Sequence, residues 1–281
     1  MKKISRRSFL AAAAVSAAAL ALTACGGSAS TASSAAASSV AASSEAASTS
    51  AAAAELTTVE AGKLTMATNA TFPPYEMTTD AGTIEGIDVD TAQAIAEKLG
   101  LELQIDDMDF DAALLSVQQG KADIAMAGIT VTDERMAVMS FSDSYATGIQ
   151  SIIVPEGSDI ASPDDLAGKK IGTQRGTTGY LYCSDDFGED AVVAYDNGLT
   201  AVQALNNGQV DAVVIDNEPA KAYVESNPGL KILDTSYAEE DYAIGMNKSN
   251  TALEDAVNAA LEELKADGTL QSIVDKYITA E

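Results

Sequence analysis

The stretch FDAALLSVQQGKADIAMAG, residues 110–128, combines a helical pattern of apolar residues with an apolar run that follows a glycine. The spacing predicts a helix over Asp111–Gln119 that ends at Gly120, and a strand over Asp123–Ala127. A helix that leads into a strand is part of a β-α-β unit, which indicates a sheet covered by helices.

A second stretch, LTAVQALNNGQVDAVVID at residues 199–216, repeats this plan. It predicts a helix over Thr200–Asn206 and a strand over Ala212–Ile215. Short matches can arise by chance in a single domain, but the repeat favours two α/β lobes of similar plan. At a shift of 88 residues, the matched positions are Gly120 with Gly208, Asp123 with Asp211 and Gly128 with Asp216.

Strands and helices alternate around both stretches, with predicted strands over Lys63–Thr68, Leu101–Ile105 and Lys170–Thr173, and a helix over Asp88–Leu99. In open α/β sheets, ligands bind beyond the carboxyl ends of the strands. If the two lobes face each other, the residues at these ends line one cleft. These residues are Asn69, Gly128, Gln174 and Asp216.

The chain is expected to cross between the lobes twice, near Ala146–Val154 and near Asp241–Met246. The last stretch then returns to the first lobe, where Asn250 is expected to cap a helix. Two crossings make a hinge, which permits closure around a ligand. We therefore predict lobe 1 over residues 59–147 and 244–281, and lobe 2 over residues 148–243.

The composition excludes several kinds of function. The chain has 281 residues, a formal net charge of −26 and no His. An acidic surface repels nucleic-acid backbones. The missing His removes serine–histidine and cysteine–histidine catalytic sites and the commonest zinc ligand. We therefore expect no catalytic residues, metal, cofactor or nucleic-acid partner, and, since nothing indicates an obligate oligomer, a monomer.

The first 24 residues have the features of an export signal. Basic residues up to Arg7 precede an apolar stretch, Phe9 to Leu22, that is too short to span a bilayer. Residues 5–10 resemble a twin-arginine signal, and the general secretory route stays open. We predict a signal peptide over residues 1–24.

Leu22-Thr-Ala-Cys25 resembles the lipobox of bacterial lipoproteins, in which the Cys is acylated. The alternative is an isolated Cys in an apolar run. Residues 26–58 are nearly all Ala and Ser, which predicts a flexible tether. We therefore predict that residues 25–58 are a lipidated Cys25 and a tether, which anchor a globular part to the outer face of the cytoplasmic membrane.

The motif from Gly128 to Arg135 offers groups that bind a carboxylate. Gly128 permits close approach of the backbone, Thr130 has a hydroxyl, and Arg135 can donate two parallel hydrogen bonds. The alternative is a surface arginine that opens a helix. The loop Gly176–Gly179 precedes a helix, whose free N–H groups favour an anion, although Thr177 and Thr178 can simply cap that helix.

Asp216 ends a buried apolar run and is the candidate anion for a ligand ammonium, with a polar turn before Pro219 as the alternative. Phe72 and Phe110 can sandwich a ligand side chain or belong to the core. The acidic pairs Asp106-Asp107 and Glu239-Glu240 are expected on a solvent-exposed face.

Several motifs resemble one family when taken in order over residues 60–281. They are Gly86-Ile-Asp-Val-Asp-Thr-Ala-Gln-Ala-Ile-Ala-Glu-Lys-Leu-Gly100, Ala127-Gly-Ile-Thr-Val-Thr-Asp-Glu-Arg135, Phe141-Ser-Asp-Ser-Tyr145 and Asp165-Leu-Ala-Gly-Lys-Lys-Ile-Gly172. The chain resembles the polar amino acid-binding solute-binding proteins, the periplasmic binding protein class that serves ABC importers. The resemblance implies a type II two-lobed fold, a free amino acid as ligand, a permease partner and no enzymatic activity.

The resemblance also implies roles for single residues. It assigns the α-carboxylate to Arg135, Thr130, Gly128 and Thr178, the α-ammonium to Asp216, and the side-chain pocket to Asn69, Phe72, Phe110 and Gln174, where we also place Thr177. Basic amino acid binders similar to this chain carry Asp at the position of Asn69, and a glutamine binder carries Lys at that of Gln174. The pocket therefore favours a polar uncharged side chain. Arg175 and Glu76 are nearby charges of unknown direction, so acidic and basic ligands stay open.

Two other functions stay open. A few proteins similar to this family dehydrate small carboxylic acids, which would require a carboxylate such as Glu76 or Glu218 as acid or base. A ligand-sensing subunit would have an identical binding domain.

Overall fold

The structure is a computed structural model that describes residues 56–278. The predicted signal peptide, Cys25 and nearly all of the tether lie outside the described residues. No helix of the described part is long and apolar enough to cross a membrane.

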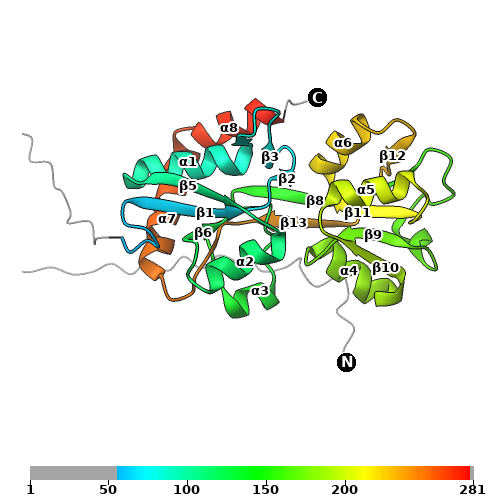
Figure 1. The fold of residues 1–281 in the computed structure, drawn as a ribbon, viewed down its shortest axis with the longest axis horizontal. Coiled ribbons are helices and arrows are strands. Elements are labelled where there is room, and N and C mark those ends of the chain that lie inside the picture. The colour runs from blue at the N-terminus through cyan, green and yellow to red at the C-terminus, as the bar shows by residue number, and fades with distance from the viewer. Residues whose placement is uncertain (1–55, 279–281) are drawn as a thin grey trace, which may run out of the picture. The chain divides into compact units, whose positions relative to one another are not determined.

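The first sheet has five strands in the order β5-β1-β6-β14-β7 (Figure 1). The first three pair in parallel, and β14 runs antiparallel to both of its neighbours. The strands are β1 (Lys63–Thr68), β5 (Glu102–Asp107), β6 (Ile124–Ala125), β7 (Ser140–Phe141) and β14 (Gly245–Met246). The helices are α1 (Ile87–Leu99), α2 (Phe110–Gln118), α3 (Asp133–Val138), α7 (Thr251–Ala266) and α8 (Thr269–Tyr277).

The second sheet repeats this arrangement in the order β10-β9-β11-β8-β12, with β13 also paired to β8. Again three strands are parallel, and the fourth, β8, runs antiparallel to its neighbours. The strands are β8 (Ala146–Pro155), β9 (Ile171–Gln174), β10 (Val192–Tyr195), β11 (Ala212–Asp216), β12 (Leu230–Ile232) and β13 (Ala238–Tyr242). The helices are α4 (Thr178–Phe187), α5 (Gly198–Asn206) and α6 (Asn217–Glu225), with short turns η1 (Pro163–Leu166) and η2 (Glu189–Ala191).

A small third sheet joins β2 (Thr71–Phe72), β3 (Glu76–Thr78) and β4 (Ile84–Glu85). The alternation of helices and strands predicts parallel sheets, and this holds only for the three strands at one side of each large sheet. The antiparallel strands β8 and β14 are the first strands that the chain adds after passing from one sheet to the other, so they enter from the opposite end.

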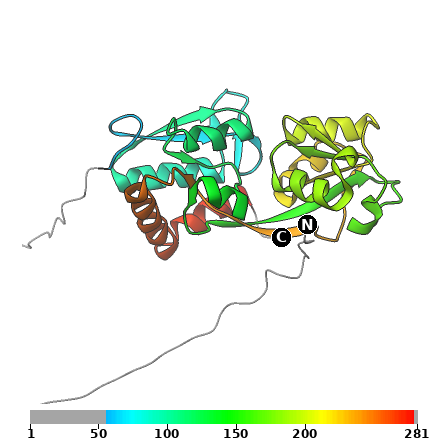
Figure 2. The ribbon, with the colours of Figure 1, turned by 90° about the horizontal axis from the view of Figure 1, so that it is seen from below.

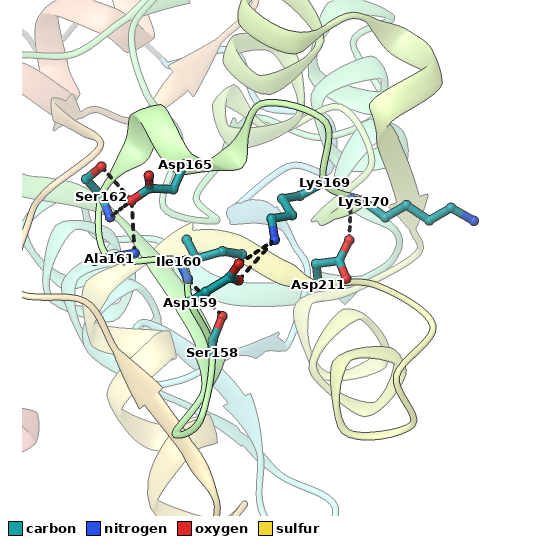
Figure 3. Close-up of polar contacts among 9 residues, drawn as sticks. All are labelled: Ser158, Asp159, Ile160, Ala161, Ser162, Asp165, Lys169, Lys170 and Asp211. Carbon is teal, nitrogen blue, oxygen red and sulfur yellow. Dashed lines mark hydrogen bonds and ion pairs between the residues drawn. The ribbon is translucent and has the colours of Figure 1, made fainter.

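The sequence repeat has a structural cause. Helices α2 and α5 begin and end 88 residues apart. The matched aspartates also do the same thing: Asp123 accepts a hydrogen bond from the N–H of Thr65 in β1 (2.8 Å), and Asp211 accepts one from the N–H of Lys170 just before β9 (2.7 Å, Figure 3). Each carboxylate thus ties the middle one of the three parallel strands of its sheet to the turn that follows the neighbouring helix. The prediction of two α/β lobes of similar plan is confirmed.

The chain passes between the sheets through β8 and β13, which pair antiparallel from Ala146 with Tyr242 to Gln150 with Ala238. Figure 2 shows these two strands side by side along the path from one lobe to the other. The predicted two-strand hinge is therefore present, although its second strand begins at Ala238 rather than at Asp241. The three acidic residues in β13 hide this strand from a hydropathy pattern. The predicted boundary residues of the lobes stay a prediction.

The apolar cores all lie within residues 64–278. Asn250 caps α7 as predicted, since its side-chain oxygen accepts from the N–H of Leu253 (3.3 Å). Cys183 is buried in the core of the second lobe. Residues 56–278 lie within one compact unit, so a protein that comprises residues 51–281 contains all the apolar surface that the described fold buries.

Candidate functional site

One cavity collects all the sequence-predicted site residues. It measures about 430 Å³, including the space at its open mouth, and has residues of both lobes in its walls. The structure thus brings together residues more than a hundred positions apart, while their individual roles stay predictions. The predicted residues that line it are Asn69, Phe72, Phe110, Gly128, Thr130, Arg135, Gln174, Thr177, Thr178 and Asp216.

Arg135 is buried at the start of α3 and is not a surface residue. Its guanidinium donates to the carbonyl oxygens of Thr130 (2.7 Å) and Gly176 (3.1 Å) and lies 5.3 Å from the centre of the Phe110 ring. Thr130 belongs to the first lobe and Gly176 to the second, so this side chain joins both. A guanidinium has five N–H donors, and those that remain can bind a ligand carboxylate.

The two threonines predicted for the ligand carboxylate lie face to face. The hydroxyl oxygens of Thr130 and Thr178 are 3.5 Å apart across the cleft. Thr177 caps α4, because its hydroxyl accepts from the N–H of Tyr180 (3.4 Å), and it also donates to the carbonyl of Gln174 (2.9 Å). The helix-capping interpretation is therefore correct for Thr177. A cap and an anion site are compatible, since the other N–H groups of the first turn still point outward.

Glu240 corrects one expectation. The pair Glu239-Glu240 was expected on a solvent-exposed face, but the Glu240 side chain is buried. It accepts hydrogen bonds from the Thr130 hydroxyl and from the Gln150 side chain, both at 3.0 Å. Burial follows from strand alternation in β13, where every second side chain points inward. The Thr130 hydroxyl thus has an internal carboxylate partner that a ligand carboxylate would replace.

Asp216 ends β11 and begins α6, so both interpretations of this residue hold. One carboxylate oxygen accepts from the N–H of Glu218 (3.1 Å) and caps α6. The other accepts from the N–H of Ile149 (2.8 Å) and from the Tyr242 hydroxyl (2.7 Å). Burial is the main cause that raises the pKa of Asp216 to about 6. The carboxylate is fixed in direction and has no cation beside it among the described residues, as an ammonium-binding group requires.

Aromatic and amide side chains close the other part of the cavity. The Phe72 ring stacks on Tyr75 at 5.8 Å and packs against the cores of both lobes. Asn69 accepts a hydrogen bond from Gln174 (2.9 Å), which joins the lobes a second time. Both aromatic interpretations are therefore partly right, because Phe72 belongs to the cores and to the wall of the cavity.

Arg175 and Glu76, the two charged residues near the cleft in sequence, differ in exposure. Arg175 is exposed and lies beside Asp196, with 3.9 Å between the charged atoms, outside the main cavity. Glu76 lines the cavity, is fully buried, and neither of its oxygens receives a hydrogen bond from an N–H or O–H group of the described residues. Of these two charged residues, the one that faces the cavity is therefore the acid.

Sequence analysis missed Gln150 and Tyr242, which also line the cavity. Both lie in the crossing strands β8 and β13, and Tyr242 and Glu240 have the same inward direction. Strand alternation could have predicted them, because in a hinge strand that borders a cleft every second side chain faces the cleft. No cluster of His, Cys, Asp and Glu suited to a metal ion occurs among residues 56–278.

Comparison with known proteins gives the family. Residues 64–280 match the model of the bacterial extracellular solute-binding proteins, family 3. The chain belongs to this family. It is 31% identical over 227 residues to a putative ABC transporter arginine-binding protein 2 of Escherichia coli, a match that covers 79% of this chain and 93% of that protein.

Solved structures of the family agree in fold. A structure described as an ancestral arginine-binding protein bound to arginine has a TM-score of 0.74 and 43% identity, and covers 77% of this chain and 98% of that one. Another, described as an ancestral arginine-binding protein bound to glutamine, has a TM-score of 0.73 and 41% identity, and covers 78% and 99%. The predictions of the family, of a two-lobed α/β fold and of a binding protein rather than an enzyme are confirmed.

Proposed function

We propose that this solute-binding protein captures a free amino acid outside the cytoplasm and delivers it to the permease of an ABC importer. The observation that carries the proposal is the pairing of a buried Arg135 and a buried Asp216 in one cavity. A free amino acid has a carboxylate and an ammonium on one carbon, and burying either without a partner costs several kcal/mol. Arg135 and Asp216 supply the two partners.

The remaining contacts divide between the lobes. Arg135, Thr130 and Gly128 come from the first lobe, whereas Thr178 and Asp216 come from the second. A ligand held by the first set alone has an unpartnered ammonium until the second lobe closes over it. Closure is then favoured by the ligand, because only the closed arrangement satisfies both of its charges.

The side chain of the ligand is best matched by a cation. Of the buried charged groups around the cavity, four are acids (Glu76, Asp88, Asp216 and Glu240), and Arg135 is the one buried cation of residues 56–278. A neutral amino acid leaves this excess of acids unchanged, whereas a cationic one reduces it. The names of relatives that bind arginine support this choice. The neutral pocket inferred from Asn69 and Gln174 becomes the second candidate.

The proposal includes the cellular location of the protein. The basic and apolar residues 1–24 export the chain, and a lipid on Cys25 holds it at the outer face of the cytoplasmic membrane through the Ala/Ser tether. Replacing Cys25 with Ser in the full-length chain should release the protein from the membrane fraction without changing ligand affinity. Membrane association that persists in this variant would contradict the lipid anchor.

A thermal-shift panel tests the binding function. Residues 51–281, refolded to remove any co-purified ligand, would be screened against the twenty amino acids. A ligand at a thousand times its dissociation constant adds about 4 kcal/mol, which for a domain of this size raises the melting temperature by roughly 8–16 °C. We expect the largest rise with arginine or another cationic amino acid. No rise with any amino acid would refute the proposed function.

A further inference from the structure

Glu76 lies in the wall of the cavity, and its carboxyl group forms a buried pair with that of Asp88, which lies behind it. Glu76 comes from β3 and Asp88 from the first turn of α1, and both have an exposure of 0%. One oxygen of Asp88 accepts from the N–H of Gly128 (3.0 Å), and the Tyr145 hydroxyl lies beside the same carboxyl group and lowers its pKa. Neither oxygen of Glu76 receives an N–H or O–H donor. Such a pair is unusual, because buried polar groups almost always have hydrogen-bond partners.

No positive group compensates the pair. The titratable groups that face it are themselves acids or tyrosines, and none of them is a lysine or arginine. They are Asp107, Tyr75, Tyr145 and Tyr223. The carboxyl groups of Glu76 and Asp88 interact directly, and two such groups in a buried site do not both stay ionised, so the pair holds one shared proton.

The shared proton resides on Glu76. Burial, followed by the charge of Asp88, raises the pKa of Glu76 well above its ordinary value. Burial also raises the pKa of Asp88, to about 6, but the hydrogen bond from Gly128 lowers it and thus opposes this rise. Asp88 therefore ionises first, and a protonated Glu76 donates to it.

We propose that Glu76 and Asp88 are the specificity element for the ligand side chain, and that a cationic side chain binds there in exchange for their shared proton. The inference rests on the proposed function. The proton on Glu76 leaves to solvent, no covalent bond to carbon changes, and the cation takes its place beside the carboxylate. A neutral amide side chain can instead use the protonated pair without any exchange, so pH sets the preference between the two ligand types.

The direction of the pH effect follows from linkage. In the free protein the pair holds a proton that the complex with a cation does not hold, so binding a cation releases it. Affinity for the cation therefore falls as pH decreases below the pKa of the pair, by up to about tenfold per pH unit. Asp216 also titrates near the ligand, but it contacts the ammonium of every amino acid, so its effect is common to both ligand types and disappears from their difference.

Calorimetry of residues 51–281 with L-arginine and L-citrulline tests the inference. The two ligands have nearly the same shape, and only arginine carries a side-chain charge. Titrations at pH 6.5 in phosphate and in a buffer with a large ionisation enthalpy give the number of protons released by each ligand. We expect arginine to release on the order of one proton more than citrulline. In Glu76→Gln, which keeps the shape and removes the titration, this difference should disappear.

The possible outcomes separate the two proposals. Equal proton release by both ligands, or an arginine-specific release that persists in Glu76→Gln, would overturn the exchange while leaving the binding function intact. If citrulline binds too weakly to titrate, the release of protons by arginine is compared between the wild type and Glu76→Gln instead. If Glu76→Gln no longer binds arginine, the difference in proton release between arginine and citrulline on the wild type decides, and equal release by both ligands contradicts the exchange. Absence of binding by any amino acid would refute the proposed function and the exchange with it.

Discussion

The two ends of the cavity differ in how their charged groups are satisfied. At the end with Arg135 and Asp216, each charged group already has protein partners that fix its direction: two carbonyls for the arginine, and two N–H groups and a hydroxyl for the aspartate. At the end with Glu76, a buried carboxyl group receives no hydrogen bond from an N–H or O–H group of the described residues, and another carboxyl group lies beside it. The first end is built for the part that all amino acids share. The second end lacks a partner that the ligand side chain would supply.

The largest expected effect comes from breaking the end that all ligands share. Arg135→Ala leaves the ligand carboxylate buried without a cation, and removing one member of a buried ion pair costs about 3–5 kcal/mol. We expect binding of every amino acid to weaken by a factor of at least about 100 in calorimetric titrations. Arg135→Lys is the control, because it keeps the charge but not the planar fork. Normal binding by Arg135→Ala would show that the carboxylate site lies elsewhere.

A second substitution affects both ends by opposing closure. Gly176 has a φ of +73°, and a Cβ atom there would lie 1.7 Å from a carboxylate oxygen of Asp111 in the other lobe. The Asp111 side chain is exposed and can turn away, so Gly176→Ala should weaken all ligands by a factor of up to about 10, for a cost of about 1 kcal/mol in the closed state. Small-angle scattering should show that compaction requires a correspondingly higher ligand concentration.

Gly168→Ala is the matched control. Gly168 has nearly the same φ, +75°, but nothing lies within 4 Å of its Cβ position. This variant places a side chain at a matching positive φ without the contact between lobes. If both variants weaken binding equally, strain rather than blocked closure explains the loss.

A third prediction concerns pH and closure without ligand. Burial in the closed arrangement raises the pKa of Asp216 to about 6 from an ordinary value of 3.8. Closing at a pH between these values therefore takes up a proton, and ionisation at pH 7 opposes closure by roughly 3 kcal/mol. The ligand-free protein should become more compact in scattering experiments between pH 7 and pH 5. Asp216→Asn should be equally compact at both pH values, and a response to pH that survives in this variant would assign the effect to another group.

The smallest effect is expected from Gln174, which lies at the side-chain end. Gln174→Ala removes its hydrogen bond to Asn69 in the other lobe, and a neutral hydrogen bond contributes about 0.5–1.5 kcal/mol. We expect affinities to change by a factor of about 2–10 and the order of preferred amino acids to shift. Gln203→Ala on the exposed face of α5 should change neither. An unchanged order of preference would place the determinant of specificity outside this contact.

The sequence predicts the architecture well because periodicity reports directly on burial. The helix at Asn250 and the aspartates of the repeat follow local rules that need no tertiary information. Ten residues of the cavity were also predictable, because strand ends of both lobes meet at one cleft.

The remaining features depend on which way a side chain points. Glu240 has the same local sequence signal as its exposed neighbour Glu239, and only strand alternation in β13 separates them. Glu76 and Arg175 are both charged residues near the cleft in sequence, yet one is fully buried in its wall and the other is exposed. For this reason the sequence favoured a neutral ligand but left acidic and basic ligands open. A count of charged residues in the sequence does not show which way each side chain points, because that depends on the fold.

Recognition of the ligand zwitterion by Arg135 and Asp216 is tested most directly by calorimetric titration of residues 51–281 with L-arginine and with agmatine, which lacks only the carboxylate. We expect arginine to bind and agmatine to bind at least about 100-fold more weakly, because Arg135 loses its partner while the Glu76 end is unchanged. Agmatine that binds as tightly as arginine would contradict this recognition, since the cavity would then bind the side chain without the zwitterion.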